Sequence, residues 1–164
     1  MTVYKSKSAG AAIAAPAVGV SLGHREVAEA DHWILSLSPL PELACTHLVR
    51  EPFPHVAISL VGGPVFDEPL PAAGGLVAGR AVVFPGVERL VGTLAVADVL
   101  ALSAIDEVTV LGGGVAEPES LLETGEFVRP QYRAGRLILT TMPAVGGRLV
   151  PFESRNPTPC CAAH

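Results

Sequence analysis

The chain has 164 residues, which is enough for one domain with a sizeable hydrophobic core. Its 11 Lys and Arg against 16 Asp and Glu give a formal net charge of −5, and this balance argues against a nucleic-acid-binding protein, which normally carries a basic patch. Hydrophobic residues make up 49% of the chain and charged residues only 16%. A monomer with so few charges would expose much apolar surface, so the composition predicts a homo-oligomer or a subunit of a larger protein complex.

Three cysteines are too few for a disulfide scaffold, and their odd number favours a reducing compartment. We therefore expect a cytoplasmic protein. No run of about 18 strongly apolar residues is present, so the sequence predicts no transmembrane segment. Secretion is the second expectation, because Lys5 and Lys7 precede a weakly apolar stretch over residues 9–20, as in a secretory signal.

Residues 1–23 are rich in Ala and Gly and poor in Leu and Phe. This composition is typical of a low-complexity segment, and we expect an extended arm that packs on a neighbouring molecule. Residues 24–164 contain no internal repeat and no second domain boundary. They are predicted to form a single β-rich globular domain that ends in a Cys/His tail.

Short apolar segments alternate with Pro- and Gly-rich breaks through this domain, which is typical of β-strands joined by turns. Residues 43–49 fit either a strand or a short helix, because so short a window cannot separate the two periodicities. After a charged turn, the predicted strands are residues 32–38, 55–61, 80–84, 107–111 and 135–142.

Two short helices are predicted in the second half of the chain. Residues 94–103 place Leu94, Ala97 and Leu100 on one helical face, and Thr93 can cap the first turn. Residues 118–124 have proline at their start and glycine directly after their end, which is the asymmetry expected of a helix.

The order of these elements indicates how they connect. Strand 80–84, the first predicted helix and strand 107–111 fit a βαβ crossover. Gly146 and Gly147 predict a tight turn into a C-terminal hairpin. The predicted fold class is therefore α+β, a β-rich single domain with one mixed sheet, two short helices and a C-terminal hairpin.

The C-terminal tail holds the densest group of reactive side chains, Cys160, Cys161 and His164. The i, i+3 spacing of Cys161 and His164 brings a sulfur and an imidazole to the same side of a single helical turn. Cys45 and His47, at i and i+2, would share a face on a strand. Two Cys and two His from these places match the ligand set of a structural zinc site, with iron also possible, and Cys160 could replace Cys161.

Three functions fit these features. The first is a small metal-binding accessory subunit of an oligomeric assembly, ligated by Cys and His from the tail. The second is a structural subunit without a metal. The third is an enzyme whose nucleophile is Cys161, activated by His164 or His47. No G-x-S-x-G, H-E-x-x-H or kinase signature is present, so the enzyme is the less favoured expectation.

Overall fold

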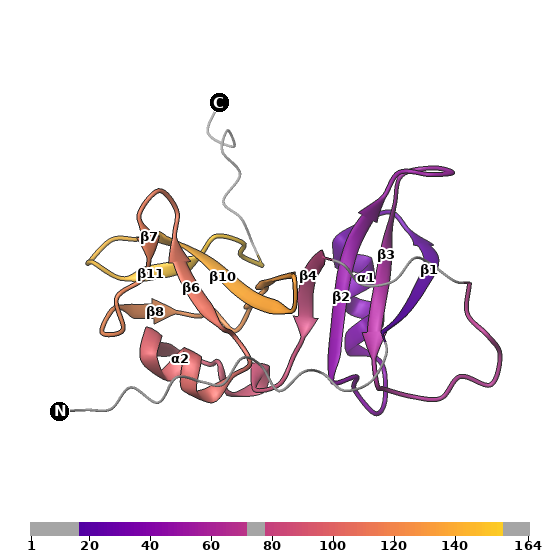
Figure 1. Ribbon diagram of the computed structural model, residues 1–164, viewed down its shortest axis with the longest axis horizontal. Helices are drawn as coiled ribbons and strands as arrows, with labels where there is room; N and C mark the ends of the chain where they lie inside the picture. The colour runs from indigo at the N-terminus through magenta and orange to yellow at the C-terminus, as the bar shows by residue number, and fades with distance from the viewer. Residues whose placement is uncertain (1–16, 72–77, 156–164) are drawn as a thin grey trace. The chain divides into compact units, whose positions relative to one another are not determined.

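The computed structural model describes residues 17–71 and 78–155 of the chain. The described residues fall into two compact units, each built on β-strands (Figure 1). The first unit contains residues 17–71, 78–85 and 131–137. The second unit contains residues 86–130 and 138–155.

The first unit is an antiparallel sheet with one helix. Its strands are hydrogen-bonded in the order β1-β3-β2-β4-β9. Helix α1 contacts strands β1 to β4 and lies on one face of the sheet (Figure 1). The elements are β1 (Val18–His24), α1 (Val27–Leu35), β2 (Leu43–Val49), β3 (His55–Val61), β4 (Ala78–Val83) and β9 (Gln131–Arg133).

Helix α1 takes the place of the strand predicted over residues 32–38, so that prediction is wrong. The Glu29 carboxylate accepts hydrogen bonds from the backbone N–H groups of Arg25 at 3.1 Å and Glu26 at 3.4 Å, which satisfies donors at the start of the helix. Ala30 and Ile34, four residues apart, are fully buried against the sheet. Burying a side chain the size of isoleucine contributes about 1.5–3 kcal/mol, which outweighs the strand propensity of this short segment.

The second unit contains a mixed arrangement of short strands and one α-helix. Strands β10, β11, β8 and β5 are neighbours in that order, and β6 pairs in parallel with β10 and antiparallel with β7. Its buried side chains include Val96, Val99, Ile105, Leu122 and Leu139. The elements are the 3-10 turn Val87–Arg89, β5 (Thr93–Ala95), α2 (Val96–Leu102), β6 (Glu107–Val110), β7 (Gly114–Val115), β8 (Leu121–Glu123), β10 (Arg136–Pro143) and β11 (Leu149–Pro151).

The predicted fold class is confirmed. The described residues are β-rich, with a mixed sheet and two α-helices, and β10 and β11 form the expected C-terminal hairpin. Strands β3, β6 and β10 lie where the sequence predicts them, and residues 43–49 adopt the strand alternative as β2. The division into one globular domain over residues 24–164 stays a prediction.

Two further predictions in the second unit are wrong. Residues 118–124 form a turn and strand β8 rather than a helix, because only Leu122 of the strand is buried and its neighbours alternate outward. Thr93 lies in β5 and pairs with Glu123, so it is not the cap of α2. Strands β4 and β6 are not paired with each other, since β6 takes β10 as its parallel partner and β4 pairs antiparallel with β2 and β9, so the βαβ crossover stays a prediction.

Part of the predicted arm belongs to the sheet. Residues 18–23 lie in β1, which pairs with β3, whereas residues 1–16 lie outside the described part of the chain. The tail with Cys160, Cys161 and His164 also lies outside the described part of the chain. Over residues 17–71 and 78–155, no helix is long and apolar enough to cross a membrane.

Candidate functional site

Cys45 and His47 project from the same face of β2, because alternate residues of a strand point the same way. In the register of the sheet, Cys45 lies opposite Ser59 and His47 lies opposite Ala57 on β3. The intervening Thr46 belongs to the other face, where its hydroxyl accepts a hydrogen bond from Arg80 at 3.3 Å. Cys45 and His47 therefore lie on the face of the sheet that is opposite α1.

The thiol of Cys45 is fully buried, with 0% of the residue exposed. Burial raises its pKa from 9.0 to about 12, because a thiolate loses its hydration in these surroundings. At neutral pH the side chain is therefore a neutral thiol. It is unreactive as a nucleophile, and a metal ion would bind it only by displacing its proton.

Stability at alkaline pH is expected to report this thiol. As the pH rises above 9.0, the unfolded chain loses the Cys45 proton while the folded chain keeps it until about pH 12. The contribution of the Cys45 thiol to stability is therefore complete below its pKa in the unfolded chain, and it falls as the pH rises toward its pKa in the folded chain. Relative to Cys45→Ala, we expect the wild-type free energy of unfolding to fall by up to about 1.4 kcal/mol per pH unit in this window.

Urea unfolding of both proteins, with a chelator present, measures this difference between about pH 8 and about pH 11. The other titrating groups are common to the two proteins and cancel in the comparison. Parallel curves over the whole window would contradict a buried neutral thiol at Cys45.

His47 is held in its neutral form. Its pKa lies below 6.5, first because of burial and second because of the neighbouring His55 imidazole. Its Nδ1 atom is buried and has no hydrogen-bond partner among the described residues. A neutral imidazole with an unused nitrogen is the form in which histidine binds a metal ion.

A second polar pair, which the sequence did not indicate, lies on the same face. Ser21 of β1 and His55 of β3 are joined by a hydrogen bond of 2.6 Å between Oγ and Nε2. The Nδ1 atom of His55 donates to the Phe53 carbonyl at 2.8 Å. Ser59 lies four residues after His55 on the same face of β3. It is fully buried, and its hydroxyl has no hydrogen-bond partner in the described part of the chain.

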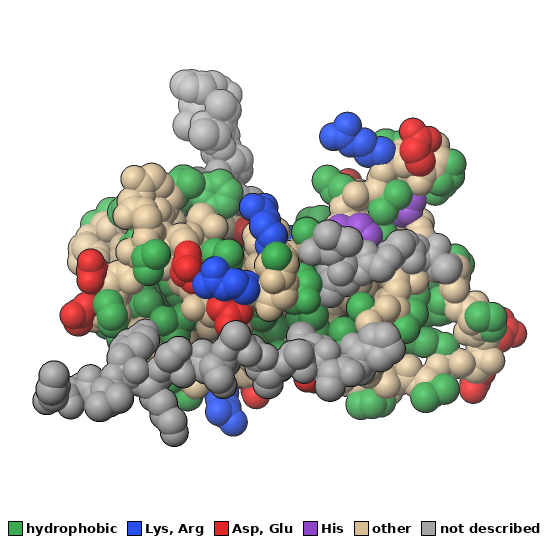
Figure 2. Space-filling model, viewed as in Figure 1, with side chains coloured by type: hydrophobic (Ala, Val, Ile, Leu, Met, Phe, Trp, Pro, Cys, Tyr) green, Lys and Arg blue, Asp and Glu red, His purple; other side chains and the backbone are tan. Residues whose placement is uncertain are grey.

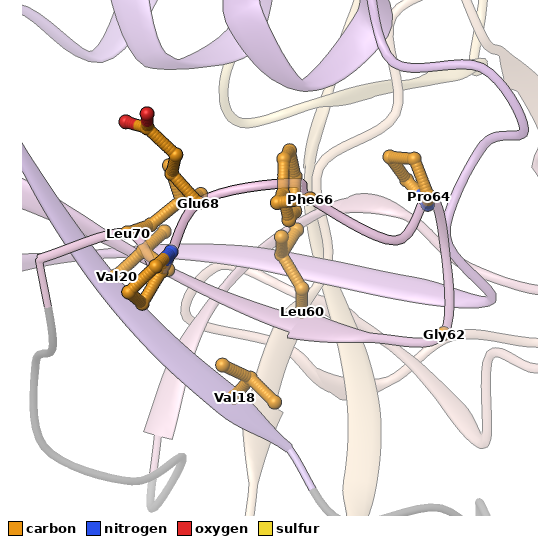
Figure 3. Close-up of a pocket in the computed structure, with 9 residues that line it drawn as sticks. Val18, Val20, Leu60, Gly62, Pro64, Phe66, Glu68 and Leu70 are labelled. Carbon is orange, nitrogen blue, oxygen red and sulfur yellow. The ribbon is translucent and has the colours of Figure 1, made fainter.

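An open apolar groove lies elsewhere on the first unit. It has a volume of about 330 Å³ and runs between strands β1 and β3 and the loop that follows β3. Figure 3 shows Phe66 above Leu60 and the Glu68 carboxylate directed away from Val18. Phe66 also stacks on Trp33 of α1, with ring centroids 6.1 Å apart. The groove therefore offers apolar contact surface rather than a group of reactive side chains.

The predicted metal ligands are brought together only in part. Cys45 and His47 share a face, but no three His, Cys, Asp or Glu side chains converge on a possible metal position within residues 17–71 and 78–155. Cys160, Cys161 and His164 lie outside those ranges, so their convergence with β2 stays a prediction.

Comparison of the chain with protein-family models, with curated proteins and with solved structures finds no match. Function is therefore inferred from the chemistry of the chain's own side chains.

Proposed function

We propose that the protein is a small metal-binding accessory subunit of a homo-oligomeric or larger protein assembly, with zinc or iron held by Cys and His side chains. The observation that supports this best is His47, a neutral imidazole whose buried Nδ1 is unused in the described residues, on the same strand face as Cys45. Thiolate and imidazole are the ligands that zinc prefers, with iron as the next candidate.

The strand spacing suits two ligands of one ion. Alternate residues on a strand lie about 6.6 Å apart along the chain, and Zn–S and Zn–N bonds are about 2.3 and 2.0 Å, so modest side-chain rotation brings both donors to one ion. A closed tetrahedral site needs four ligands. The tail would supply the others, from Cys160, Cys161 and His164.

The charge and the redox state fit this proposal. Cys45 is a free cysteine, as expected in the cytoplasm, where thiols stay reduced. The net charge of −5 suits a protein partner rather than a nucleic acid.

Exposed apolar side chains support assembly with other subunits. Figure 2 shows hydrophobic side chains spread over the visible face of both units, with few Lys or Arg among them. The apolar groove adds to this surface in the first unit. Large hydrophobic residues that are more than half exposed are Val18, Leu35, Leu40, Leu48, Val65, Val91, Leu111, Val115, Val145 and Phe152. So much apolar surface is typical of a protein that buries part of it against a partner.

Metal analysis of the purified protein tests the proposal. We expect about one equivalent of zinc or iron per chain in the wild type. Cys45→Ala and His47→Ala should each hold less than about a tenth of an equivalent, because a four-ligand site loses most of its affinity when one ligand is removed. His32→Ala is the matched control, since His32 is an exposed histidine on α1, and it should keep the wild-type metal content.

Two outcomes would contradict the proposal. A wild-type protein with less than about a tenth of an equivalent of metal would leave a structural subunit without a metal. A stable, well-behaved monomer in sedimentation velocity would contradict the assembly. The two parts of the proposal can therefore fail separately.

A further inference from the structure

The pair formed by Ser21 and His55 has the geometry of a nucleophile and its base. The two residues are 34 positions apart in the chain, yet their side chains meet at 2.6 Å, a short hydrogen bond. We propose that Ser21 is a nucleophile for acyl transfer from small esters and that His55 is its general base. This inference rests on a different observation from the proposed metal site and does not depend on it.

The partners of His55 fix the position of its proton. A carbonyl oxygen can only accept a hydrogen bond, so the 2.8 Å contact to the Phe53 carbonyl assigns the proton to Nδ1. In the neutral ring, Nε2 then carries a lone pair that faces the Ser21 hydroxyl. This is the arrangement that a general base needs, with the backbone carbonyl as the group that orients the ring.

The surrounding structure holds both groups in place. His55 is only 5% exposed, lies on β3 opposite Val49 of β2, and has the Phe53 ring beside it, with ring centroids 5.1 Å apart. The backbone N–H of Ser21 donates to the Pro71 carbonyl at 2.8 Å. Ser21 itself is half-buried rather than buried, so a small reagent can reach its hydroxyl.

A spare hydrogen-bond donor lies on the same face. Ser59 pairs with Gly19 on β1, two residues from Ser21, and its buried hydroxyl has no partner among the described residues. Ala57, which is fully buried and two residues from His55 on the same face of β3, is the small neighbour and favours a short, uncharged acyl group.

The proposed step balances without a further reagent. The Ser21 oxygen attacks the ester carbonyl carbon, and its proton passes to Nε2 of His55. The bond from that carbon to the alcohol oxygen breaks, and the leaving alkoxide takes the proton from His55. Water then attacks the acyl-serine with the same base, which releases the carboxylic acid and restores Ser21.

Covalent labelling tests the proposal in the intact protein. Phenylmethanesulfonyl fluoride should add its sulfonyl group to the Ser21 oxygen with loss of fluoride, and peptide mass spectrometry locates the modified residue. In a separate assay, the protein should hydrolyse p-nitrophenyl acetate. Ser21→Ala should lose both reactions. His55→Ala should slow both by at least about 100-fold, the usual contribution of a positioned base, and added imidazole should restore part of the rate.

Ser36→Ala and His32→Ala are the matched controls. Ser36 bonds the Trp33 carbonyl rather than an imidazole, and His32 is exposed, so both variants should react as the wild type does. Wild-type protein that is not modified at Ser21 would overturn the proposal, and this result requires no variant to fold. Labelling of Ser21 that is equally fast in folded His55→Ala would also overturn it. Imidazole rescue distinguishes a base from a purely structural histidine.

Discussion

Replacing Arg80 with alanine is expected to lower the free energy of unfolding by about 3–5 kcal/mol, because it leaves a buried carboxylate without its guanidinium partner. Arg80 on β4 donates two hydrogen bonds to Asp31 on α1, at 2.7 and 2.9 Å. Both side chains are nearly buried, with 12% and 10% of their surface exposed. The pair therefore ties α1 to the sheet that carries Cys45 and His55.

Urea or guanidinium unfolding measures the effect, with two comparisons that isolate burial as its cause. Arg148→Ala breaks an ion pair with Glu123 of similar length, 2.6 Å, but with 46% of each side chain exposed. This control should cost less than about 1 kcal/mol. The double variant Asp31→Leu with Arg80→Met removes both charges and should recover most of the loss. An Arg80 variant no less stable than the Arg148 variant would contradict this account.

The second large effect is expected from Gly86→Ala in the second unit. Gly86 has φ of +87°, a conformation that L side chains adopt at a cost of about 1–2 kcal/mol. An added Cβ would also overlap the Leu102 carbonyl oxygen and lie 2.6 Å from the Cα of Ser103. Both contacts are with backbone atoms at the C-terminal end of α2, which cannot rotate away as a side chain could. We expect a total loss of at least about 3 kcal/mol.

Gly92→Ala separates the two causes. Gly92 has φ of +67°, but a Cβ there would meet nothing within 4 Å. Its replacement should cost only about 1 kcal/mol, from the backbone conformation alone. Thermal unfolding of the two variants measures the difference. Equal losses would mean that the close approach of Gly86 to the end of α2 adds nothing to stability.

Local patterns predicted the elements whose residues have one dominant periodicity. The apolar run His55–Val61 is a strand with every residue buried, and Arg136–Pro143 forms a hairpin with Leu149–Pro151 across a glycine turn. The run around Trp33 and Ile34 is apolar enough for either a strand or a helix. It becomes helical because Ala30 and Ile34 meet the sheet together, a contact that a local window does not contain.

The two candidate sites also differ in whether the sequence could predict them. The shared face of Cys45 and His47 follows from their spacing once β2 is a strand, so the sequence could propose it. The contact between Ser21 and His55 could not be proposed, because it requires the register of β1 against β3. Neither residue belongs to a recognisable motif, and a lone serine in an apolar strand carries no signal of its own.

By itself, the sequence determined the α+β class, the positions of strands β3, β6 and β10, the C-terminal hairpin and the lack of charge, because these depend on composition and on neighbours along the chain. Only the tertiary structure decided that α1 covers one face of the sheet, that Ser21 meets His55, and that the Cys45 thiol has a pKa of about 12. Burial and strand register arise from segments distant in sequence, and desolvation and hydrogen-bond geometry follow from them.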